Sequence, residues 1–156
     1  MWERYGFDGQ IIALHRGACL PWAHPHSASK LIRRSMALLP SRYKVITATV
    51  DGAAGEIGTV YQACGFDYVG TMRAGGRTRV VINGTQISER QAGRIAGTQG
   101  ARALAQLGFD AAPAPRVARY FAFRGSRRER RELRAAIAHL IKPYPKRSAA
   151  AAPPAR

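Results

Sequence analysis

The stretch DGAAGEIGTVYQACGFDYVG, residues 51–70, decides the fold of this chain. It follows YKVITATV (residues 43–50), which is rich in β-branched side chains and stops at an Asp-Gly pair, so we predict a strand that ends at Asp51. A short helix is expected next, ended by Gly65 in the left-handed conformation that terminates many helices. DYVGTM then resumes as a strand. The order strand, helix, strand indicates an α/β fold.

The short helix places three polar side chains near one another. It is expected to begin near Gly55-Glu56 and to carry Tyr61 in its middle. Because the carboxyl ends of strands in an open α/β sheet face the ligand crevice, Asp51, Glu56 and Tyr61 can all approach one site.

Segments on both sides continue the α/β pattern. Ser27 or Ser29 is expected to cap the helix SASKLIRRSM, whose apolar face would hold Leu31, Ile32, Met36 and Leu39. The turn of a β-hairpin is expected at Asn83-Gly84, and DAAPAPR (residues 110–116) is expected to be a linker. Further strands are predicted within residues 9–17, 78–88 and 118–125, and further helices within residues 88–109 and 127–141.

Composition sets the class of protein and points to a partner. The 156 residues are 46% hydrophobic, which suits one globular domain, and no apolar run or leader pattern predicts a membrane span or signal peptide. The chain holds 25 Lys and Arg against 9 Asp and Glu, a net charge of +16, with eight arginines within residues 116–134. Such a surface suits phosphate contact, and hence a polyanion such as DNA; the alternative is a merely solvated charge.

The central stretch resembles a known family. Tyr61-Gln-Ala-Cys-Gly65-Phe66 is similar to the Y-x-x-x-G-F signature of GNAT-type N-acetyltransferases. The longer string D-G-x-x-G-E-x-G-T-x-Y-Q-A-x-G-F-x-Y-x-G resembles bacteriophage Mom-type DNA-modification proteins, a divergent GNAT branch that alters adenine in DNA. The 27–36 helix, Arg119-Tyr120 and the PYPK of residues 143–146 resemble other parts of that branch, so the similarity runs over about residues 17–146.

This resemblance implies a GNAT-like mixed sheet flanked by helices and shortened at the N-terminus. Chain length favours one domain, over residues 1–147, and the low-complexity composition of residues 148–156 predicts a disordered tail. The resemblance also implies acetyl-CoA or a related acyl donor. The pyrophosphate loop Q/R-x-x-G-x-G/A of the wider superfamily has no match in HPHSASK (residues 24–30), which leaves the donor open.

The resemblance assigns roles to individual residues. Tyr61 would be the general acid that protonates the leaving group, and Asp51 and Glu56 would position or deprotonate the adenine amine. The alternatives are a buried helix tyrosine with a satisfied hydroxyl, a turn-forming aspartate and a glutamate that favours a helix dipole. Cofactor contacts are expected at Ser29, Gly58 and Thr59. Nucleic-acid contacts are expected at Arg119, Tyr120, Arg127, Arg128, Arg131 and Lys146, although residues 119–124 fit a strand with one buried face better than a surface that stacks a base.

No metal site is predicted, because Cys19, His24 and His26 lack the paired spacing of a zinc site. Cys64 is expected to be inert on an apolar helix face. The expected function is transfer of a small acyl-derived group, such as an acetamido or carbamoylmethyl group, to adenine N6 in DNA. This would protect phage DNA from restriction in the cytoplasm of the host bacterium. Two alternatives remain: an ordinary N-acetyltransferase acting on a protein or small amine, and a nonenzymatic basic DNA-binding remnant.

Overall fold

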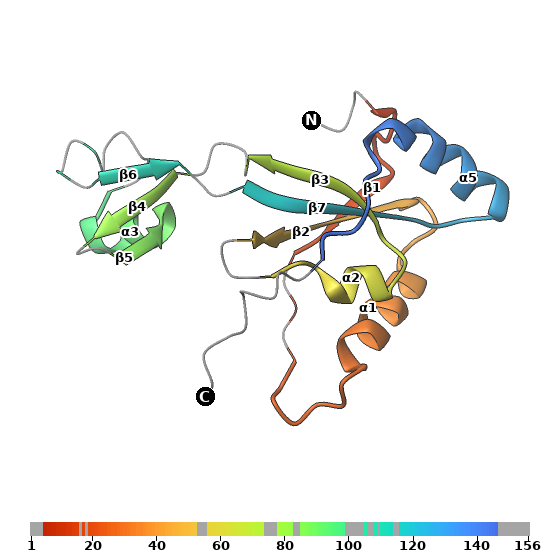
Figure 1. The fold of residues 1–156 in the computed structure, drawn as a ribbon, viewed down its shortest axis with the longest axis horizontal. Coiled ribbons are helices and arrows are strands. Elements are labelled where there is room, and N and C mark those ends of the chain that lie inside the picture. The colour runs from red at the N-terminus through yellow and green to blue at the C-terminus, as the bar shows by residue number, and fades with distance from the viewer. Residues whose placement is uncertain are drawn as a thin grey trace. The chain divides into compact units, whose positions relative to one another are not determined.

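The computed structural model describes residues 5–146 except 16, 18, 53–55, 74–77, 83–84, 99–104, 106–107, 109 and 114–115. These residues form two compact units (Figure 1). The main unit combines residues 1–72 with residues 117–156, and the small unit spans residues 73–116. The prediction of one domain over residues 1–147 stays a prediction, and the predicted tail at 148–156 lies outside the described residues.

A four-stranded mixed sheet forms the centre of the main unit. Its strands lie in the order β1-β2-β7-β3. They are β1 (Ile11–Leu14), β2 (Val45–Asp51), β7 (Arg116–Phe123) and β3 (Asp67–Arg73). β1 runs parallel to β2, whereas β2 and β7 are antiparallel, with Ala48 opposite Tyr120. The predicted α/β fold with a mixed sheet and flanking helices is therefore confirmed, including the strand that ends at Asp51.

Helices cover both faces of this sheet, because β2 and β7 alternate apolar side chains to the two sides. One face, here called the α2 face, buries Ile46, Phe66 and Tyr120 beneath α1 (Ser27–Leu38) and α2 (Thr59–Ala63). The other, the α5 face, buries Phe7 and Phe121. It is covered by α5 (Arg127–Ala136), the 3₁₀ turn η3 (Ala138–Leu140) and the segment around Phe7 (Figure 1).

Helix α1 begins where the sequence predicts, but two details of the prediction are wrong. The residue before the helix is His26, and neither predicted serine caps it: the Ser29 hydroxyl donates to the His26 carbonyl at 3.0 Å. Ile32 and Met36 pack on the core one helical turn apart. Leu31 is 58% exposed, because it lies about 100° around the helix from Ile32.

In the small unit, the described residues form a three-stranded sheet and the helix α3 (Glu89–Ala96). The strands, in the order β5-β4-β6, are β4 (Thr78–Ile82), β5 (Thr85–Ser88) and β6 (Asp110–Pro113). The predicted hairpin is confirmed, with its turn at residues 83–84 outside the described part of the chain. The predicted linker is wrong, because β6 pairs antiparallel with β4. Pro113 is tolerated there since it ends an edge strand, where a missing N–H costs little.

Across the parts of the chain that the structure describes, no helix is long and apolar enough to cross a membrane.

Candidate functional site

Helix α2 is shorter than the sequence predicts and begins later. The expected start near Gly55-Glu56 is wrong: the helix runs from Thr59 to Ala63, and Gly58 precedes it. Gly58 has φ +69°, a left-handed conformation that a helix cannot include. The helix can therefore start only after this glycine.

The end of α2 is fixed by the glycine that the sequence singles out. Gly65 adopts φ +78°. Its N–H donates to the Gln62 carbonyl and the Phe66 N–H donates to the Tyr61 carbonyl, both at 3.0 Å. These two bonds form a Schellman motif, which satisfies the last carbonyls of the helix. As a result, the Phe66 ring lies 5.4 Å from the Tyr61 ring and helps to fix its position.

Tyr120 of β7 holds the segment just before α2 in place. Its side chain is completely buried, and its hydroxyl donates to the Ile57 carbonyl at 2.6 Å. Gln62 donates to the same carbonyl at 3.0 Å. Burial raises the pKa of Tyr120, so the phenol stays a neutral donor. Since Tyr120 has no exposed surface, a nucleic acid cannot reach its ring in this structure, and the residue supports the site rather than contacting a base.

Tyr61 is half-buried between two aromatic rings, with centroids 5.4 Å from Phe66 and 5.7 Å from Tyr120. Its pKa is raised, first by burial, then by the negative charge of Glu56 and by Cys64. The phenol is therefore protonated at neutral pH and can serve as a proton donor. Within the described residues its hydroxyl has no hydrogen-bond partner, which leaves the proton available.

Both predicted carboxylates precede this helix in the chain. Asp51 is the last residue of β2, half-buried and opposite Val117 of β7. Glu56 is exposed, and its charge acts on the Tyr61 phenol. Glu56 therefore lies within electrostatic range of Tyr61, and Asp51 lies at the carboxyl end of β2, whereas the approach of all three side chains to one site stays a prediction.

Of the three predicted cofactor residues, Ser29 lies on α1, Thr59 is the first residue of α2 and Gly58 precedes it. The two helices are joined by polar contacts. Arg33 donates to the Ala63 carbonyl at 3.0 Å, and the Cys64 thiol donates to the Ser29 carbonyl at 3.5 Å. Burial raises the pKa of Cys64, an effect that Arg33 partly opposes, so the thiol is a poor nucleophile.

These cofactor residues do not form a phosphate cradle. Gly58 is buried against the Tyr120 ring, and the Ser29 hydroxyl donates to its own helix. Only Thr59 offers an exposed side chain. The described residues also contain no group of three His, Cys, Asp or Glu side chains placed to hold a metal ion.

The predicted nucleic-acid residues are mostly exposed, and several lie on α5. Arg127 and Arg131 are exposed there, whereas Arg128 pairs with Glu132 at 2.8 Å. Arg119 is half-buried on β7, and Lys146 is exposed near the C-terminus. The α5 face is the side of the sheet opposite to the Tyr61 helix (Figure 1).

Sequence reasoning missed one ion pair that joins α5 to β3. Arg134 donates two hydrogen bonds to the Asp67 carboxylate, at 2.7 and 2.8 Å. These residues are far apart along the chain and belong to no local motif, so no sequence signal identifies the pair.

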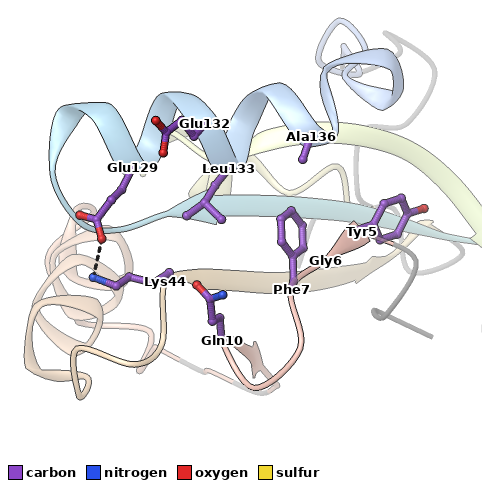
Figure 2. Close-up of a pocket in the computed structure, with 9 residues that line it drawn as sticks. All are labelled: Tyr5, Gly6, Phe7, Gln10, Lys44, Glu129, Glu132, Leu133 and Ala136. Carbon is purple, nitrogen blue, oxygen red and sulfur yellow. Dashed lines mark ion pairs between the residues drawn. The ribbon is translucent and has the colours of Figure 1, made fainter.

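A cavity of about 310 Å³ lies on the α5 face, between α5 and the segment around Phe7 (Figure 2). It is lined by Tyr5, Gly6, Phe7, Gln10, Lys44, Glu129, Glu132, Leu133 and Ala136. The Glu129 carboxylate accepts a hydrogen bond from the Ser126 N–H at 2.7 Å and forms an ion pair with Lys44 at 3.0 Å. These contacts lower the pKa of Glu129 to about 2, with the Ser126 bond the larger cause. The polar groups of the cavity thus stabilise the start of α5, and the cavity lies away from the Tyr61 helix.

Comparison with curated proteins gives no match. Comparison with protein families gives a match to the Mom protein family over residues 8–146. The match includes the β2-α2-β3 segment, the small unit and α5, so it covers nearly every described residue. The chain therefore belongs to the Mom protein family, and is a Mom-type phage protein of a DNA-modifying kind.

Proposed function

We propose that this protein transfers a small acyl-derived group to the N6 amine of adenine in DNA, on a GNAT-like fold, and so protects phage DNA from restriction nucleases. The observation that carries this proposal is the neutral phenol of Tyr61, which has no hydrogen-bond partner among the described residues and lies within range of the Glu56 charge. Membership of a DNA-modifying family supplies the substrate class. The proposed place of action is the cytoplasm of the infected bacterium, where phage DNA is exposed to restriction.

The reaction needs an amine, an activated carbonyl carbon and groups that move two protons. The N6 nitrogen attacks the carbonyl carbon and forms the new C–N bond, and the bond from that carbon to the leaving group breaks. Glu56, assisted by Asp51, takes the proton lost by the amine. Tyr61 gives its proton to the departing group, and both residues then exchange protons with water.

The raised pKa of Tyr61 suits this role. A phenol that stays protonated at neutral pH keeps its proton until a stronger base forms, which is the leaving group as its bond breaks. The nearby Glu56 charge works in the same direction, because it disfavours the phenolate.

The donor is proposed as acetyl-CoA or a related acyl compound. Ser29 and Gly58 do not supply a phosphate cradle, so no step of the reaction is assigned to them. Thr59, exposed at the first position of α2, is the remaining proposed donor contact.

The experiment is mass spectrometry of nucleosides from cells that express the protein. A mass-shifted deoxyadenosine is expected from the wild type. Tyr61→Phe keeps the ring packing and removes only the hydroxyl, so modification should fall about 100-fold or more while DNA affinity stays the same. Tyr43→Phe is the matched control, because it also removes a phenol oxygen. Tyr43 precedes β2, and its hydroxyl accepts a hydrogen bond from Arg42 at 2.9 Å.

Three outcomes contradict the proposal. Equal modification by wild type and Tyr61→Phe removes the acid assignment. Unmodified DNA that still binds the protein indicates a DNA-binding remnant. Acyl-CoA-dependent acetylation of a protein or small amine, with no change in DNA, indicates an ordinary N-acetyltransferase.

A further inference from the structure

Exposed apolar side chains gather in one part of the main unit. The segment formed by residues 20–38, here called the α1 segment, includes α1 and the loop before it. Four of the six large apolar side chains found exposed in the described chain lie in it: Leu20 at 59%, Trp22 at 79%, Leu31 at 58% and Leu38 at 83%. Exposed large apolar side chains concentrated in one segment are candidates for a binding surface.

The loop before α1 holds Trp22 in a defined position. The Ala23 N–H donates to the Leu20 carbonyl at 2.9 Å, which closes a turn with Pro21 in its second position. The Ser27 N–H donates to the His24 carbonyl at 2.8 Å, which closes a second turn at the start of the helix. Trp22 is therefore presented to solvent by an ordered turn, where its binding costs little conformational entropy.

The same segment carries positive charge that no nearby acid offsets. Residues 9–50 contain six Lys and Arg and no Asp or Glu. Lys30 and Arg34 are exposed one helical turn apart, on the side of α1 away from Ile32, and neither has an acidic partner within the described chain. Two unpaired cations at this spacing suit neighbouring phosphates of a nucleic-acid strand.

The α1 segment also lies beside the helix that carries Tyr61. Arg33 donates to the Ala63 carbonyl, and the Cys64 thiol donates to the Ser29 carbonyl, so the first two turns of α1 rest against the end of α2 (Figure 1). Both helices cover the α2 face of the sheet. Lys30 and Arg34 thus lie on the helix that packs beside the one carrying the proposed general acid, and Trp22 lies in the turn that leads into that helix.

We propose that the α1 segment binds the strand that carries the unpaired adenine, with Trp22 stacked on a nucleobase and Lys30 and Arg34 on the flanking phosphates. This inference rests on the proposed function, because N6 of a paired adenine faces its partner base and the nucleotide must leave the stack to react. Aromatic side chains and cations together are the usual means of holding unstacked bases. The net charge of +16 favours DNA over a second copy of the chain as the occupant.

Tryptophan fluorescence tests this surface directly. The chain has two tryptophans, so Trp2→Phe leaves Trp22 as the single emitter. In that background, a duplex with one adenine opposite an abasic site should quench the emission, and the fully paired duplex should quench it far less. Trp22→Ala should weaken binding of the first duplex by about 5- to 160-fold, the range expected for losing one stacked base, and Trp22→Phe should restore most of the affinity.

Matched variants separate the cations from the ring. Lys30→Ala with Arg34→Ala should weaken both duplexes and flatten the dependence of log K on log salt, whereas Arg42→Ala, outside the segment, should not affect the preference for the unpaired adenine. Unchanged affinity in Trp22→Ala overturns the proposal. A dimer in sedimentation that is lost in Trp22→Ala also overturns it, because a second copy would then be the occupant.

The proposed function fails in a different way. Tyr61→Phe should lose modification and keep the Trp22 quenching. If it keeps full modification while Trp22→Ala loses binding, the acid assignment fails and the α1 segment proposal stands. If Tyr61→Phe loses modification while Trp22→Ala binds normally, the acid assignment stands and the α1 segment proposal fails.

Discussion

Gly58→Ala gives the sharpest test of how the Tyr61 helix is held. A Cβ at this position would lie 2.7 Å from Cε2, 2.8 Å from Cζ and 2.9 Å from the hydroxyl oxygen of Tyr120. Real Cβ atoms do not approach other heavy atoms so closely, so something must move. Tyr120 is fully buried and its hydroxyl is bonded to the Ile57 carbonyl, so the ring has no free space to turn into.

The expected loss of stability has two parts. Holding alanine in the left-handed conformation at φ +69° lowers the free energy of unfolding by about 1–2 kcal/mol. Forcing a methyl group against a buried ring adds about 1–3 kcal/mol. Together they predict a loss of about 2–5 kcal/mol in the free energy of unfolding, a large part of the 5–15 kcal/mol typical of a domain.

Gly65→Ala is the matched control for this experiment. Gly65 has φ +78° at the other end of α2, but a Cβ there would meet nothing within 4 Å. It should therefore cost only the conformational part, about 1–2 kcal/mol. Urea unfolding of wild type and both variants measures the difference. Equal losses in the two variants would refute the contact with Tyr120, and modification should fall in Gly58→Ala because the start of the Tyr61 helix is displaced.

Three further predictions concern α5. Ser126→Ala removes the capping box, in which the Ser126 hydroxyl accepts from the Glu129 N–H, and should lower stability by about 0.5–2 kcal/mol in urea unfolding. The pKa of Glu129 is lowered from 4.5 to about 2 in the folded chain, so its contribution is present above pH 4.5 and is lost as the pH falls toward 2; Glu129→Gln should flatten that part of the stability profile. Arg127→Ala with Arg131→Ala should reduce the slope of log K against log salt by about 2 for duplex DNA, and an unchanged slope in a filter-binding titration would exclude α5 from phosphate contact.

The strand-helix-strand unit could be predicted because its signals are local. Residues 45–50 of β2 are strongly β-forming, and Gly65 ends α2 through bonds within the helix itself. The start of α2 could not be predicted, because it depends on the contact between Gly58 and the Tyr120 ring, which is distant in the sequence. Local propensity at Gly55 and Glu56 carries no information about that ring.

The site shows the same division between local and distant causes. The placing of Glu56 near Tyr61 follows from a few neighbouring residues and was predictable. The role of Tyr120 was not, since its run of aromatic and basic residues resembles a nucleic-acid surface. In the structure Ala118 and Ala122 share its face of β7 and the sheet is covered on both sides, so the ring is buried. A sequence cannot say which faces of a sheet are covered until the helices are placed.

The arginines of residues 116–134 show why charge alone overstates the surface available to DNA. Arg134 is held by Asp67 and Arg128 pairs with Glu132. Arg124 donates to the carbonyls of residues 37, 39, 40 and 43, where it satisfies the end of α1 and the loop after it. These guanidinium groups already have partners within the protein, whereas Arg127 and Arg131 remain exposed on α5. The α5 face lies opposite the Tyr61 helix, so under the proposed function phosphates bound there would belong to a stretch of DNA other than the reacting nucleotide. Under the same proposal, the strand that delivers adenine to Tyr61 would be held on the α2 face, where α1 supplies Lys30 and Arg34.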